Sequence, residues 1–294
     1  MESRELRNKC DRIIQNIGEK LKENKRCIAA YLLGSASHDK LWEWSDIQIA
    51  VVLDDGYKEN MYYNLLEEEF HIVVNVYTLT AFKAFIGGIH LDDFMWKAFS
   101  KCKKIFVKDF LLDELFEEAF YVGDVERQKE MLLGFSGAVY YLNKAEKNLY
   151  IKDDVENTIY FIPQIAENIA LIEILMNKQI PERELIAQGK KLNGAVFEKI
   201  YDPLFEGKVS YAVTRNILEN VVSYLKHNTE VVYEPILSYL KKHGNLEYFR
   251  YETREHGFGI NYEWLVRCGI VERYGIPEKI SFLNQAERLG YRMR

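Results

Sequence analysis

The sequence is short of cysteine, has no excess of basic residues and lacks long apolar runs, and each shortage argues against a class of protein. Only four of the 294 residues are cysteine, and no two of them form a CxxC pair. We therefore expect neither a zinc site nor a disulfide framework. The formal net charge of -6 at pH 7 argues against a protein that binds polyanions over its whole surface.

Long hydrophobic segments are also missing. No run of about 18 consecutive apolar residues occurs, so we expect no membrane span. Residues 1–16 alternate between charged and apolar side chains and lack the apolar core of a signal peptide. Hydrophobic residues make up 48% and charged residues 29% of the chain, which is a globular composition. We expect a cytoplasmic protein, long enough for about two or three domains.

The first third of the chain alternates between helix and strand patterns. Apolar side chains recur at helical spacing from Leu6 to Leu21, which predicts a helix over residues 3–23. Short apolar runs without that period predict strands over 27–33, 45–53, 71–78 and 103–107. Two shorter helices are expected over 60–68 and 80–87.

From about residue 113 the strand patterns stop. Helices are predicted over 113–121, 126–147, 155–176, 181–197 and 213–227. Pro181 suits the first turn of a helix, because its missing N–H is not needed there. This middle region therefore has the pattern of an all-helical domain.

The last 65 or so residues show a different order of elements. Residues 228–230 are predicted to be a linker, followed by helices over 231–242, 247–254 and 261–268, strands over 270–274 and 278–282, and a last helix over 284–291. Three helices followed by a β-ribbon are typical of a winged-helix domain. Acidic and basic residues are interleaved there, so packing or dimerisation is favoured over DNA binding.

One motif links the first two predicted strands. Gly34-Ser35 follows the first strand, nine residues intervene, and Ser45-Asp46 opens the second strand. This pattern resembles the signature of nucleotidyltransferases of the DNA polymerase β superfamily. The resemblance covers about the first 110 residues and implies an α+β fold, a mixed sheet with flanking helices.

The resemblance also implies a chemistry. In this family the Gly-Ser backbone approaches nucleotide phosphates closely, and acids on neighbouring strands hold two magnesium ions. It therefore implies a nucleoside triphosphate and Mg²⁺ as cofactors. The implied nucleotide-binding residues are Gly34, Ser35, Lys40 and Ser45, and the implied metal ligand is Asp46. The two loop tryptophans, Trp42 and Trp44, are expected to pack beneath the loop.

The acid set departs from the family pattern. Gln48 stands where the second acid is expected, and Asn75 or Val73 stands where the third is expected. Asp46, Gln48 and Asn75 are thus the catalytic candidates, with one carboxylate among them. A missing charge about 4 Å from a metal costs roughly 4 kcal/mol per unit of metal charge at an effective dielectric near 20. That cost corresponds to nearly a thousandfold in rate or occupancy, at about 1.36 kcal/mol per factor of ten.

We therefore predict three regions: a nucleotidyltransferase-like domain over 1–112, a helical substrate-binding-type domain over 113–227 and a winged-helix-like domain over 228–294. The first functional hypothesis is transfer of a nucleoside monophosphate to an unidentified hydroxyl acceptor. The second is a catalytically inactive nucleotide-binding or scaffold homologue. The third is a DNA-binding regulator, which is less favoured. No membrane partner is expected, and a homodimer is left open.

Overall fold

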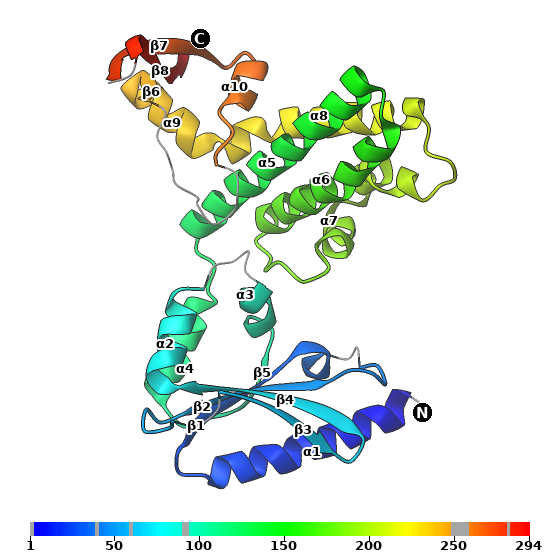
Figure 1. The fold of residues 1–294 in the computed structure, drawn as a ribbon, viewed down its shortest axis with the longest axis vertical. Helices are drawn as coiled ribbons and strands as arrows, with labels where there is room; N and C mark the ends of the chain where they lie inside the picture. Colours follow the sequence, from blue (N-terminus) through cyan, green and yellow to red (C-terminus); the bar gives the residue numbers. More distant parts are fainter. Residues whose placement is uncertain (1–2, 39–40, 59–60, 90–93, 248–258, 281–282) are drawn as a thin grey trace. The chain divides into compact units, whose positions relative to one another are not determined.

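The computed structural model describes the chain except for residues 1–2, 39–40, 59–60, 90–93, 248–258 and 281–282. The chain forms two compact units, Met1–Val122 and Gly123–Arg294 (Figure 1). The predicted α+β N-terminal fold followed by a helical region is confirmed.

The first unit is a five-stranded mixed sheet with helices on both faces. Its elements are α1 (Ser3–Glu23), β1 (Cys27–Leu33), a 3₁₀ turn (Gly34–Ser37), β2 (Ile47–Leu53), β3 (Tyr62–Glu67), β4 (Phe70–Thr78), α2 (Leu79–Gly87), α3 (Phe94–Phe99), β5 (Lys103–Val107) and α4 (Phe110–Ala119). The strand order is β3-β4-β2-β1-β5. β2 runs parallel to β4, and the other neighbours are antiparallel.

The alternation of side chains along β2 explains how the two faces are covered. Ile47, Ile49 and Val51 join one core cluster with the apolar side of α1. The opposite face lies under α2, α3 and α4, which carry aromatic side chains onto it (Figure 1). Gln48 belongs to this second face, because it alternates with Ile47 and Ile49.

One predicted element of this unit is wrong. The segment predicted as a helix over 60–68 contains the edge strand β3, which pairs with β4 in the register Tyr63↔Val74. Leu65 and Leu66 gave the segment its helical appearance, yet both side chains are exposed, by 47% and 75%. The backbone hydrogen bonds to β4 outweigh the weak local helix preference.

The second unit is a helical bundle joined to a three-stranded antiparallel sheet. Its elements are α5 (Asp124–Glu146), a π-helical turn (Lys147–Ile151), α6 (Val155–Met176), α7 (Leu185–Ile200), a 3₁₀ turn (Asp202–Leu204), α8 (Tyr211–Val232), α9 (Glu234–His243), β6 (Asn245–Glu247), α10 (Glu263–Arg267), β7 (Val271–Ile280) and β8 (Leu283–Met293). The strand order is β6-β8-β7. Among the described residues, α6 alone is long and apolar enough to cross a membrane by length and composition, and half of its apolar window is buried inside the protein.

Several boundaries in this unit differ from the sequence prediction. α7 begins at Leu185, so Pro181 lies before the helix rather than in its first turn. The predicted linker over 228–230 lies inside α8, whose buried side includes Asn228 and Thr229. The predicted final helix over 284–291 is β8, because these residues pair with β7 along nearly their whole length. The predicted strand over 270–274 and the described part of the one over 278–282 form the single strand β7, while residues 281–282 lie outside the described residues.

The C-terminal segment is held to the helices by hydrogen bonds that range from buried to exposed. The Trp264 indole donates to Thr229 Oγ1 at 2.9 Å, and the Asn261 backbone N–H donates to Ser136 Oγ at 3.0 Å. Arg267 makes two hydrogen bonds, at 2.7 and 2.8 Å, to the carboxylate of Glu146 on α5. These bonds explain why residues 228–294 belong to the same compact unit as the helices. The predicted helix over 247–254 falls mostly outside the described residues, and the winged-helix assignment stays a prediction.

Candidate functional site

The Gly34-Ser35 motif lies where β1 ends and the chain turns away from the sheet. Gly34 has a φ of +68°, a left-handed conformation that costs other residues roughly 1–2 kcal/mol. The Ser37 hydroxyl donates to the Gly34 carbonyl at 2.7 Å, and the His38 N–H donates to the Ser35 carbonyl at 3.2 Å. A Cβ added to Gly34 would meet only the Gln48 side chain, at an ordinary distance of 3.6 Å. The backbone conformation, rather than crowding within the protein, therefore requires the glycine.

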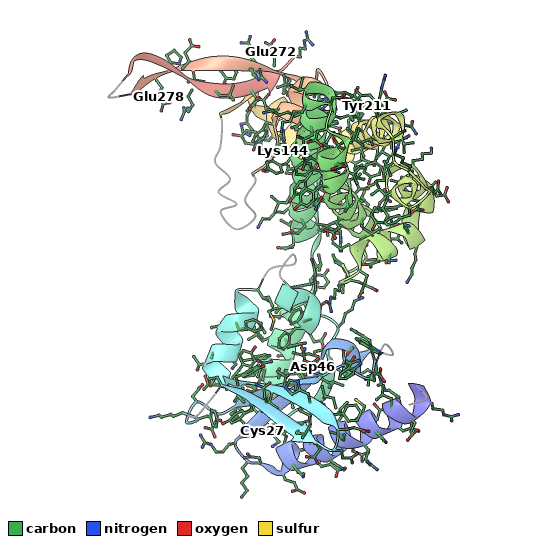
Figure 2. The ribbon with its side chains drawn as sticks, turned by 45° about the vertical axis from the view of Figure 1, so that its right-hand side comes forward. Cys27, Asp46, Lys144, Tyr211, Glu272 and Glu278 are labelled. Atoms are coloured by element: carbon green, nitrogen blue, oxygen red, sulfur yellow. The ribbon has the colours of Figure 1, made fainter. Side chains whose placement is uncertain are left out.

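Asp46 and Gln48 lie on the same side of the chain at the start of β2. The Gln48 amide donates to the Asp46 carboxylate from Nε2 to Oδ2, at 3.0 Å. Both residues are half-buried (Asp46 is labelled in Figure 2). The residue at the second acid position is therefore a neutral hydrogen-bond donor to the carboxylate that remains.

The position of the third acid can be read from the register of β2 and β4. Gln48 pairs with Val73, and Ala50 pairs with Asn75, so all four side chains share one face of the sheet. The residue directly opposite Gln48 is thus an apolar valine, only 8% exposed. Asn75 lies one pair further from Asp46, and its assignment as a site residue stays a prediction.

The donor set does not fit two magnesium ions. Magnesium prefers carboxylate and phosphate oxygens in octahedral geometry, and this face offers a single carboxylate that already accepts a hydrogen bond from an amide. Among the described residues, no group of three or more histidine, cysteine, aspartate or glutamate side chains is placed to hold a metal ion. The described residues of this face therefore do not supply the ligands of a two-metal site.

The loop between the two motifs differs from expectation in one respect. Trp42 and Trp44 are 64% and 78% exposed, so the prediction that they pack beneath the loop is wrong. Ser45 closes a tight turn, since its hydroxyl accepts from the Trp42 N–H at 3.1 Å and its own N–H donates to the Trp42 carbonyl at 2.9 Å. This turn presents both indoles to solvent. Lys40 lies outside the described residues.

Three polar residues on the same face were missed by the sequence analysis. His71 Nε2 lies 2.8 Å from Asn64 Oδ1, and the Tyr62 hydroxyl donates to the same oxygen at 3.2 Å. The assignment of 60–68 as a helix hid Tyr62 and Asn64. Their spacing of two residues, before a turn and a valine-rich strand, was the signal available in the sequence.

A positive charge lies near the loop that follows Gly34. Arg7 of α1 donates a hydrogen bond from its guanidinium to the His38 carbonyl at 3.0 Å. The same guanidinium pairs with Asp11 one helical turn away. The end of the Gly34–Ser37 turn is therefore braced from α1 by a residue that also carries charge complementary to phosphate.

Comparisons with known proteins identify the N-terminal fold. Residues 15–109 match the family model described as polymerase beta, nucleotidyltransferase. The whole chain is similar in fold to a nucleotidyltransferase-like protein from Exiguobacterium sibiricum 255-15, with a TM-score of 0.61 and 13% sequence identity. That similarity covers 94% of this chain and 96% of the other. No curated protein matches the sequence.

Proposed function

Since its N-terminal unit belongs to the polymerase β nucleotidyltransferase superfamily, we propose that this chain binds a nucleoside triphosphate without carrying out two-metal nucleotidyl transfer. The Gly34–Ser37 turn supports phosphate binding, because such turns direct backbone N–H groups toward an anion. The protein would then act through the bound state, as a sensor or scaffold.

The observation that carries this proposal is the hydrogen bond from Gln48 to Asp46. In the two-metal reaction both positions must offer anionic oxygen to the ions. Here the Gln48 side chain is neutral, and its amide N–H donates a hydrogen bond to the Asp46 carboxylate. Each missing charge forfeits roughly 4 kcal/mol per unit of metal charge at an effective dielectric near 20, less whatever a neutral oxygen ligand returns.

Calorimetric titration with ATP, GTP, CTP and UTP tests the proposal. We expect at least one triphosphate to bind with similar affinity in magnesium and in EDTA. We also expect no release of pyrophosphate over hours in the presence of small hydroxyl compounds. Binding to Asp46→Ala should stay independent of magnesium, because the carboxylate holds no metal.

A gain-of-function variant makes the test sharper. The pair Gln48→Asp and Asn75→Asp adds the missing acids, and binding should become dependent on magnesium. Val73→Asp replaces Asn75→Asp in a second arm, since Val73 lies directly opposite Gln48. The pair Gln15→Asp and Asn16→Asp is the matched control, because it adds the same two charges to exposed positions of α1, on the other face of the sheet.

Two results would contradict the proposal. Pyrophosphate release by the natural chain that disappears in Asp46→Ala would identify an active nucleotidyltransferase. Failure of all four triphosphates to bind would leave a scaffold that keeps the fold alone.

The DNA-binding alternative gains no support from α10. Its Trp264 and Leu265 are buried, by 99% or more, and its Arg267 is engaged by Glu146. A helix that reads DNA must present free polar side chains to base edges. We therefore do not propose DNA binding through this helix.

A further inference from the structure

A polar cluster extends the candidate site across two further strands. It consists of Tyr62 and Asn64 on β3 and His71 on β4, joined at Asn64 Oδ1 by contacts of 3.2 and 2.8 Å. Tyr62 is 53% exposed, and His71 is exposed as well. Residues that are exposed and yet held in one arrangement are suited to contact a ligand.

The strand registers place this cluster on the same face as Asp46 and Gln48. Val73 pairs with Gln48 on one side and with Asn64 on the other. Ile47, the first residue of β2, pairs with Ile72, so Asp46 and His71 each come one residue before this pair. Because neighbouring strands lie about 4.8 Å apart, the chain at Asp46 enters the sheet beside the start of β4.

The contact with Asn64 orients the imidazole of His71. Asn64 Oδ1 is an acceptor, so Nε2 donates to it, and no described group is bonded to Nδ1. The Asp46 carboxylate on the same face is an acceptor, while the Asn64 and Asn75 amides supply donors.

This mixture of groups favours a hydroxyl over a phosphate. A phosphate offers only acceptor oxygens and negative charge, and the Asp46 carboxylate would repel it. A hydroxyl group donates one hydrogen bond and accepts others, so it matches the acceptors and the amides together. The cluster thus suits hydroxyl groups, whereas the Gly34–Ser37 turn suits phosphate, although the two lie on the same sheet.

We propose that Tyr62, Asn64 and His71 bind the hydroxyl groups of a sugar. This inference rests on the proposed nucleotide binding. It identifies the sugar as the part of the ligand that contacts this end of the sheet. The hydroxyls come either from the ribose of the bound nucleotide or from a separate polyol. β1, the strand that precedes Gly34, lies two strand spacings from β4, which is roughly 10 Å. The phosphates and ribose of one nucleotide can cover this distance.

The first arm of the test compares ATP with 2′,3′-dideoxy-ATP by calorimetry. We expect ATP to bind roughly tenfold more tightly, as the loss of one or two net hydrogen bonds predicts. In His71→Phe this preference should fall to nearly one, while dideoxy-ATP binds as before. His227→Phe, an exposed histidine of α8, is the matched control and should keep the preference.

The second arm uses a separate polyol. The protein is saturated with inorganic tripolyphosphate, methyl β-D-ribofuranoside or myo-inositol is added, and the His71 ring nitrogens are followed by NMR. A shift at Nδ1, lost in Asn64→Leu, would assign the hydroxyls to a separate ligand and would stand even if ATP does not bind. Equal affinity for ATP and dideoxy-ATP, together with no shift from either polyol, would overturn the inference while leaving nucleotide binding intact.

Discussion

One face of the sheet in the N-terminal unit has two different ends. At one end Tyr31 is fully buried beneath aromatic rings, and at the other end Gln48 is half-buried and His71 is exposed. The buried end is built by residues from α2, α3 and α4. Tyr31 stacks on Phe82 and Phe116, with ring centroids 5.5 and 4.7 Å apart. The polar end carries the candidate site.

The difference shows why the fold persists although the acid set is incomplete. Burial of the aromatic end supplies stability in proportion to apolar area, and that term does not depend on Gln48 or Asn75. Clustered acids at the polar end would repel one another without a metal, so replacing them by amides lowers the cost of folding. Stability and the proposed ligand binding therefore reside in separate parts of one face.

The largest predicted effect breaks the buried end. Phe82 is fully buried and contacts Tyr31, Phe99 and Phe116. Phe82→Ala should lower the free energy of unfolding of the first unit by about 3–5 kcal/mol, because it removes apolar burial and leaves a cavity. Urea unfolding with hydrogen exchange at β1 and β2 amides measures this loss.

Tyr121→Ala is the control for that variant. This aromatic residue of the same unit is 77% exposed, and its loss should change the stability by less than about 0.5 kcal/mol. If Phe82→Ala costs less than about 1 kcal/mol, the aromatic cluster is not the main source of stability. The two ends of the face would then not differ in the way proposed.

A second prediction concerns the polar end. Gly34→Ala should cost roughly 1–2 kcal/mol of stability, because Gly34 has a φ of +68°. It should also weaken triphosphate binding, because it perturbs the turn that we propose to bind the phosphates. Gly87→Ala is the matched control, because a Cβ there meets nothing within 4 Å. If Gly34→Ala binds triphosphate normally once folded, the turn is structural only.

How far the sequence predicted this face depends on whether a feature is local. The helix over 3–23, the strand over 27–33 and the helix over 155–176 were predicted with the bounds observed. Each helix shows its periodicity over many residues, and the strand is a short apolar run without that period. The spacing from Gly34 to Asp46 also located the candidate site, since both residues belong to one short segment.

What the sequence did not reveal depends on pairing between segments. β3 and β8 have mixed composition, and their strand conformation is set by hydrogen bonds to β4 and β7. The cluster of Asn64 and His71 exists only through the β3–β4 register. The sequence places Gln48 and Asp46 on the same side of a strand. It does not show that the Gln48 amide donates a hydrogen bond to the Asp46 carboxylate.

A third prediction compares the same substitution in the two units. Among the described residues, no group bonds the hydroxyl of Tyr31, and burial raises the pKa of this phenol. Tyr31→Phe should therefore stabilise the first unit by about 1 kcal/mol, because it removes an unsatisfied polar group. Tyr233 is equally buried in the second unit, but its hydroxyl donates to the Asn261 carbonyl at 2.8 Å.

Tyr233→Phe should have the opposite sign and destabilise by about 1 kcal/mol. Thermal unfolding of both variants by calorimetry measures the two effects. A loss of stability in Tyr31→Phe would show that its hydroxyl has a partner after all, and the buried end would not be purely hydrophobic.

The smallest predicted effect concerns Asp55, which holds the start of α2 over the buried end. Its carboxylate accepts from the Thr80 N–H at 2.8 Å and from the Thr80 hydroxyl at 2.9 Å, and these bonds lower the pKa of Asp55 below its ordinary value of 3.8. A lowered pKa in the folded state means that the ionised form adds stability above pH 3.8, and this contribution is lost as the pH falls through the folded value.

The urea midpoint of Asp55→Asn should therefore lie below that of the natural chain at neutral pH, and the gap should close on acidification. Glu43→Gln, an exposed acid of the same unit, is the control. A gap in Asp55→Asn that stays constant from neutral to acidic pH would mean that the bonds to Thr80 do not depend on the charge of Asp55, and that α2 is held over the sheet by its aromatic residues alone.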